Sequence, residues 1–72
     1  MREWFKSIRT LQNLTLKQIA QMSNLDVTMI SKIENGDRRP GVDNAKKLAE
    51  VMNFAKYGYD WTKFYESREK VS

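Results

Sequence analysis

Side chains suited to recognition chemistry gather between residues 26 and 39 of this 72-residue sequence. Four of them recur at helical spacing, away from the apolar stripe that Ile30 and Ile33 would form: Val27, Thr28, Ser31 and Lys32. This face would combine a small apolar group, two hydroxyls and one long cation. Arg38 and Arg39 follow it directly and suit an anionic partner. The pattern indicates binding by shape, hydrogen bonds and charge.

The residue types present in the sequence argue against catalysis. The sequence contains no cysteine and no histidine, so its serines lack an obvious general base. The carboxylates that stand at informative positions have capping or pairing roles instead: Asp26, Glu34, Asp43 and Asp60. No glycine-rich phosphate loop occurs. We therefore expect no enzyme activity, no cofactor and no metal site.

Composition limits the class of protein. Residues 1–72 give room for a single domain, whose core we place over residues 2–56. No apolar run approaches the ~18 residues that span a bilayer, and Met1–Thr10 is too charged for a secretory leader, which favours the cytoplasm. The net charge is +4, and residues 1–56 carry ten Lys and Arg against six Asp and Glu. A polyanion is therefore a suitable partner.

Apolar periodicity predicts an all-α fold, a compact bundle of five short helices without a convincing strand. The predicted helices cover residues 2–12, 15–23, 26–35, 42–52 and about 60–69. Their inward positions are Trp4, Phe5, Ile8, Leu11, Ile19, Ala20, Ile30, Ile33, Val42, Ala45, Leu48, Ala49, Met52, Trp61 and Phe64.

A tight turn joins the second and third predicted helices. Thr15 and Gln18 match a capping box at the start of the second helix, and Asn24 tolerates the positive φ that a chain reversal needs. Asp26 would cap the third helix, and Gly36 would terminate it. Two short helices that cross steeply at such a turn form a helix-turn-helix, whose second helix can enter the major groove of DNA.

These residues also resemble a known family. The matches run through residues 4–54 in register and without a gap: Phe5-Lys6…Arg9, Leu14-Thr15…Ile19-Ala20, Ile30-Ser31-Lys32-Ile33-Glu34-Asn35-Gly36, Arg39-Pro40 and Leu48-Ala49…Met52. The chain resembles the Cro/cI-type (XRE-like) helix-turn-helix family of phage repressors and bacterial regulators, which implies a lambda-repressor-like fold. The closing segment Asp60–Phe64 is similar to the fifth helix of many members.

The resemblance implies sequence-specific binding to a double-stranded DNA operator, usually as a homodimer and usually with repression as the result. The base-reading positions of the family fall on Val27, Thr28 and Lys32, with Ser31 nearby. Its phosphate-contacting positions fall on Thr15, Leu16, Asn35, Arg38 and Arg39. An internal ion pair of the family would here join Arg9 to Glu34, and such a pair fixes helix register more surely than it adds stability.

Two positions depart from the usual residues of the family. Leu16 stands where glutamine is common, so only its backbone amide remains useful toward phosphate. Val27 stands where a polar residue is common. Val27 and the Thr28 methyl suit contact with thymine methyl groups, whereas Lys32 can reach guanine O6 and N7. The site should therefore favour T-rich half-sites with one guanine contact.

Two other interpretations remain open. The outer face of the third helix would be a plain solvated surface, although an exposed Val27 beside Met29 is unusual for a face that touches nothing. Alternatively, exposed Leu16, Val27 and Met29 would suit a helix-turn-helix module that docks a protein partner, such as an antitoxin bound to its toxin.

Overall fold

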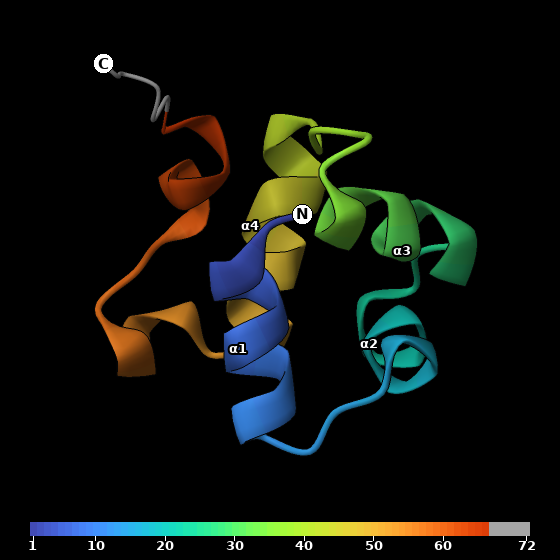
Figure 1. Cartoon of the computed structure of the whole chain (residues 1–72), viewed down its shortest axis with the longest axis horizontal. Helices are drawn as coiled ribbons and strands as arrows, with labels where there is room; N and C mark the ends of the chain where they lie inside the picture. Colours follow the sequence, from blue (N-terminus) through green and yellow to red (C-terminus); the bar gives the residue numbers. More distant parts are fainter. Residues whose placement is uncertain (67–72) are drawn as a thin grey trace.

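The computed structural model describes residues 1–66, and within that range all regular secondary structure is helical. Four α-helices come first: α1 (Glu3–Leu11), α2 (Leu16–Ser23), α3 (Val27–Asn35) and α4 (Val42–Val51). Two short 3-10 turns follow, η1 (Phe54–Tyr57) and η2 (Trp61–Tyr65). In Figure 1, α2 and α3 lie on one side of α1 and α4, and the two 3-10 turns lie on the other side. The predicted all-α class is confirmed.

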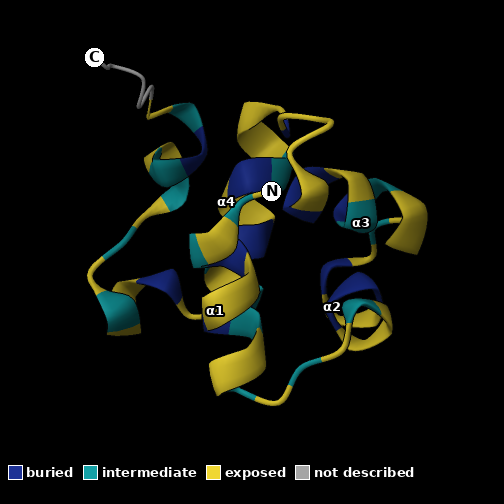
Figure 2. Ribbon diagram, viewed as in Figure 1, coloured by how far each residue is buried: buried dark blue, intermediate teal, exposed yellow. Residues whose placement is uncertain are grey.

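The inward stripes of the helices meet in one apolar core. Its buried members come from every helical element: Phe5, Ile8, Ile19, Ala20, Ile30, Ile33, Ala45, Leu48, Met52, Phe54 and Phe64. Figure 2 shows buried segments of the ribbon in dark blue, while several residues of α3 are exposed. Burial of this apolar surface is the main force that holds the short helices together, because helices of eight to ten residues are marginal alone.

The helix-turn-helix forms from local capping signals. The Thr15 hydroxyl accepts a hydrogen bond from the Gln18 amide at 3.0 Å, and the Gln18 side chain accepts from the Thr15 amide at 2.8 Å. Asn24 ends α2 in the left-handed region with φ 59°, as its residue type predicted. The carboxylate of Asp26 then accepts from the amides of Thr28 and Met29 at the start of α3. Each predicted cap of the motif is therefore confirmed.

The predicted C-terminal helix at about 60–69 is wrong in its described part. Only Trp61–Tyr65 is helical, as a 3-10 turn, and Glu66 is extended, while residues 67–69 lie outside the described range. A 3-10 turn aligns residues three apart, which places Trp61 and Phe64 on the same side. Phe64 enters the core against Trp4, with ring centroids 5.2 Å apart. Within the described residues, this segment therefore packs on the core through Phe64 as a single 3-10 turn.

Two residues that we expected inward are exposed. Leu11 is 68% exposed and Val42 is 48% exposed. Leu11 is the last residue of α1, and Val42 is the first residue of α4. The apolar stripe of each helix extends past the edge of the core at these ends. Leu11 and Val42 therefore remain exposed although they lie at the helical spacing of the buried residues.

Candidate nucleic-acid interface

The N-terminus of α2 presents two backbone amides. The amides of Leu16 and Lys17 lie in the first helical turn, where no carbonyl of the helix can accept from them. The Gln18 amide is already satisfied by Thr15, whose hydroxyl hydrogen can still be donated. The helix dipole adds partial positive charge at this end. These groups can donate to an anionic oxygen, and the family resemblance implies a phosphate contact at Thr15 and Leu16.

The outer face of α3 carries the four predicted base-reading residues. Val27 is 41% exposed, and Thr28 and Lys32 are exposed as well. Ser31 is half-buried, so it offers less of its surface to a ligand than the other three. The structure thus places these side chains on one element and leaves three of them freely accessible.

The C-terminus of α3 leads into a basic loop, Asp37–Gly41. The helix ends in a Schellman pattern: the Asp37 amide donates to the Lys32 carbonyl at 2.9 Å, and the Gly36 amide donates to the Ile33 carbonyl at 3.2 Å. Gly36 has φ 87°, which glycine adopts without strain. Asn35, Arg38 and Arg39 are all exposed beside this end. The three predicted phosphate-contacting residues therefore lie within one short segment.

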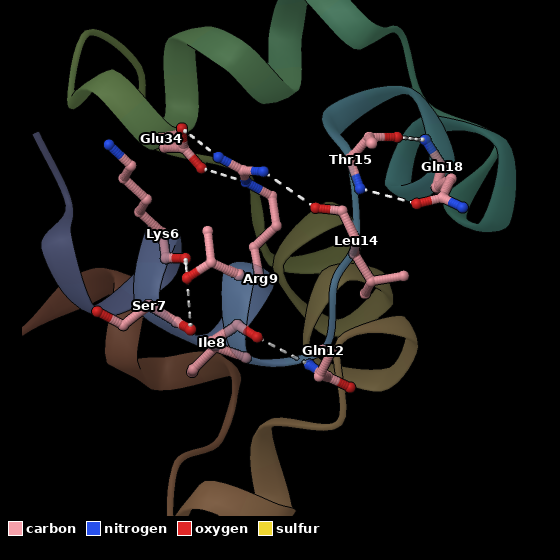
Figure 3. A network of polar contacts seen from close by, with 10 residues as sticks. Lys6, Ser7, Ile8, Arg9, Gln12, Leu14, Thr15, Gln18 and Glu34 are labelled. Atoms are coloured by element: carbon pink, nitrogen blue, oxygen red, sulfur yellow. Dashed lines mark hydrogen bonds and ion pairs between the residues drawn. The ribbon is translucent and has the colours of Figure 1, made fainter.

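Arg9 joins both ends of the motif to α1. Its guanidinium forms two hydrogen bonds with the Glu34 carboxylate, 2.7 Å from Nε and 3.2 Å from Nη2, as the resemblance implied (Figure 3). Its third donor reaches the Leu14 carbonyl at 3.0 Å, next to Thr15, and the sequence did not predict this contact. One side chain of α1 thus fixes the end of α3 and the start of α2 together. Figure 3 shows Arg9 between these two segments.

Arg2 also holds the end of α3 and the basic loop in place, and the sequence did not predict this role. Its amide donates to the Glu34 carbonyl at 2.7 Å, and its guanidinium donates to the carbonyls of Ile33 and Arg38. Burial, followed by the positive charge of Arg39, lowers the pKa of Arg2. These partners lie 31 to 36 residues away in the sequence. The sequence shows only that Arg2 is a basic residue near the start of a predicted helix, and it does not identify these partners.

Of the three apolar residues that would suit a protein-docking surface, only one is exposed. Leu16 and Met29 are half-buried and pack against the core, whereas we expected both to be exposed. Val27 remains exposed. A protein-docking surface centred on α2 and α3 therefore loses two of the three features that favoured it.

Within residues 1–66, no group of three or more potential metal-ligating side chains occurs. Over the same residues, none of the helices combines the length and apolar character needed to cross a membrane.

Comparison with known proteins agrees with this geometry. A family model described as helix-turn-helix matches residues 5–55. An uncharacterized HTH-type transcriptional regulator, YqaF of Bacillus subtilis (strain 168), is 36% identical over 66 residues, which cover 92% of this chain and 80% of the relative. No solved structure matches the chain significantly. The match includes α2, α3 and the turn between them, so the chain belongs to the Cro/C1-type, XRE-like helix-turn-helix family of DNA-binding transcriptional regulators.

Proposed function

We propose that this protein is a sequence-specific regulator of transcription, acting as a repressor, that inserts α3 into the major groove of an operator. The observation that carries the proposal is the exposed face of α3, which lies between two anion-binding features. One feature is the pair of free amides at the start of α2, and the other is the basic loop after α3. A major groove is wide enough for one α-helix with a phosphate backbone on each side.

Phosphate contacts would fix the orientation of the helix. Thr15 and the Leu16 amide would donate to one phosphate group at the start of α2. Asn35, Arg38 and Arg39 would contact the backbone at the other end of the motif. Phosphate contacts of this kind carry no sequence information, but they set the register of the protein on the duplex.

Base recognition would then fall to the α3 face. The exposed Val27 and the Thr28 methyl suit thymine methyl groups, and the exposed Lys32 suits the acceptors of guanine. Ser31 would contribute less, because it is half-buried. We infer a T-rich half-site with one guanine contact.

A homodimer would place two such helices on one face of the duplex. The half-sites would then lie about 34 Å apart, which is one helical turn of DNA. This arrangement predicts a palindromic operator, since the symmetry of the site follows the symmetry of the protein.

Selection of bound sites from random duplex DNA tests the proposal directly. We expect a recurrent motif with two inverted half-sites centred about 34 Å apart. Affinity should fall steeply with salt, with log K decreasing by about 0.9 per log unit of salt for each phosphate neutralised. Recovery of unenriched sequences, or binding that does not depend on salt, would contradict the proposal.

A protein-docking role remains a second candidate because Val27 is exposed on α3. A gel shift with random duplex at low salt separates the two functions. A module that only docks a protein would give no shift, whereas a DNA-binding regulator shifts any duplex through its phosphate contacts.

A further inference from the structure

The basic loop is fixed from both ends of the described chain. On one side of Arg39, the Arg38 carbonyl accepts a hydrogen bond from the guanidinium of Arg2 at 2.9 Å. On the other side, the Pro40 carbonyl accepts from the Tyr65 hydroxyl at 2.6 Å. Arg2 lies 36 residues before Arg38, and Tyr65 lies 25 residues after Pro40. The carbonyls of the two residues that flank Arg39 are therefore both anchored by distant side chains.

Tyr65 also contacts Arg39 itself. The Arg39 guanidinium lies over the Tyr65 ring, with its central carbon 5.7 Å from the ring centroid. Arginine stacks on aromatic faces through its planar cation, and this contact narrows the orientations that the side chain samples. Tyr65 thus restrains both the backbone beside Arg39 and the Arg39 side chain.

Positive charge is concentrated at the same place. The charge of Arg39 lies close enough to Arg2 to contribute to the lowered pKa of Arg2. Two like charges repel each other, and an anion bound between or beside them offsets that repulsion by attracting both. The surroundings of Arg39 therefore favour an anion such as a DNA phosphate.

We propose that Tyr65 is a positioning residue that orients Arg39 for a phosphate contact, with Arg2 fixing the opposite side of the loop. The inference rests on the proposed DNA-binding function and extends it to the 3-10 turn η2, outside the helix-turn-helix. A side chain already fixed in its binding geometry loses less conformational entropy on association. Tyr65 then raises affinity for every duplex equally, without touching DNA.

A double-mutant cycle tests this role. The variants are Tyr65→Phe, which removes the hydroxyl and keeps the ring, Arg39→Ala, and the two combined. The control is Tyr57→Phe, because Tyr57 is also half-buried and its ring lies beside Lys56 instead of the basic loop. Affinity for a random-sequence duplex is measured over a range of salt concentrations, and circular dichroism confirms that each variant is folded.

We expect Tyr65→Phe to weaken duplex binding about threefold to tenfold, the size of one lost hydrogen bond. Arg39→Ala should weaken binding and reduce the salt slope by about 0.9. In the Arg39→Ala background, Tyr65→Phe should have no further effect, since the residue it positions is gone. Tyr57→Phe should bind as the original chain does.

Three results would overturn the inference, and each has a separate meaning. A Tyr65→Phe effect that persists in the Arg39→Ala background would show that Tyr65 acts through the fold as a whole. Unchanged binding by Tyr65→Phe, with weakened binding by Arg39→Ala, would refute the positioning role alone. Unchanged binding by Arg39→Ala would refute the phosphate contact of Arg39 as well. Failure of the original chain to bind any duplex would instead refute the proposed function.

Discussion

The outer face of α3 and the basic loop that follows it are adjacent in sequence but have different structural origins. The face of α3 depends on a cap two to three residues away, a buried stripe within the same helix and a glycine at its end. The loop Asp37–Gly41 has no secondary structure of its own. Its carbonyls are bonded by Arg2 and Tyr65, which come from opposite ends of the described chain.

This difference separates two properties of the proposed interface. Sequence preference would depend on α3, whose shape is set by neighbouring residues. Affinity would depend largely on a loop whose shape is set by remote ones. Substitution of Tyr65 should therefore change the strength of binding and leave the preferred bases unchanged.

The largest effect should come from breaking the Arg9–Glu34 pair, the contact that connects the two ends of the motif to α1. Glu34→Ala leaves the Arg9 charge without its partner at a site where the two side chains are 16% and 8% exposed. The free energy of unfolding should fall by about 3 kcal/mol, as measured by urea denaturation. The end of α3 and the start of α2 should weaken together, because Arg9 contacts Glu34 and the Leu14 carbonyl, whereas the basic loop keeps its bonds to Arg2 and Tyr65.

Glu50→Ala is the matched control for that loss. Glu50 is exposed on α4 and has no ion pair among the described residues, so its removal should change stability by less than about 0.5 kcal/mol. Replacing both members of the pair, Arg9→Met with Glu34→Leu, should recover much of the lost stability. A loss below about 1 kcal/mol for Glu34→Ala would show that the pair is dispensable.

A smaller effect should separate base contacts from phosphate contacts. Lys32→Ala should reduce discrimination at one base pair by about 1–3 kcal/mol, measured with the selected site and its single-base variants. Arg38→Ala should instead weaken binding to every duplex about equally and lower the salt slope. A uniform loss for Lys32→Ala would move Lys32 to the phosphate-contacting group.

The dependence of α3 on its neighbouring residues can be tested at its N-cap, Asp26. Asp26→Ala should lower the free energy of unfolding by about 1 kcal/mol, because the amides of Thr28 and Met29 lose their acceptor. Thermal unfolding followed by circular dichroism measures the change. Asp26→Asn, which keeps an acceptor oxygen, should lose much less. Equal losses for the two variants would mean that the negative charge of Asp26, instead of its hydrogen bonds, stabilises α3.

The smallest effect should be a pH dependence of η2, the turn whose Tyr65 bonds the basic loop. Hydrogen bonds from the Thr62 hydroxyl and then the Thr62 amide lower the pKa of Asp60 below its ordinary value of 3.8. Because the folded pKa is the lower one, Asp60 stabilises η2 fully above pH 3.8 and loses that contribution as the pH falls through the folded value.

Acid should therefore loosen the turn that carries Tyr65. The ring resonances of Trp61 and Tyr65 in NMR spectra report this change. Asp60→Asn retains a capping oxygen without a titrating group, so the acid-dependent shift should disappear in that variant. A shift that persists in Asp60→Asn would assign the acid response to another carboxylate.

The sequence determined most of the local structure. Thr15, Asn24 and Asp26 each act through partners within a few residues, so their roles were visible from spacing alone. The family resemblance identified the Arg9–Glu34 partners, and the structure places them in contact. It could not show that Arg9 also bonds the Leu14 carbonyl, since backbone acceptors carry no residue-specific signal.

Only the tertiary structure decided what lies beyond the helix ends. The exposure of Leu11 and Val42 depends on where the core stops, which periodicity does not encode. In η2, a 3-10 turn carries Phe64 onto Trp4, a partner that lies far away in the sequence. Capping groups are satisfied within one turn of chain, whereas the carbonyls of an irregular loop are satisfied by whichever donors the fold brings near. For the basic loop, those donors are Arg2 and Tyr65.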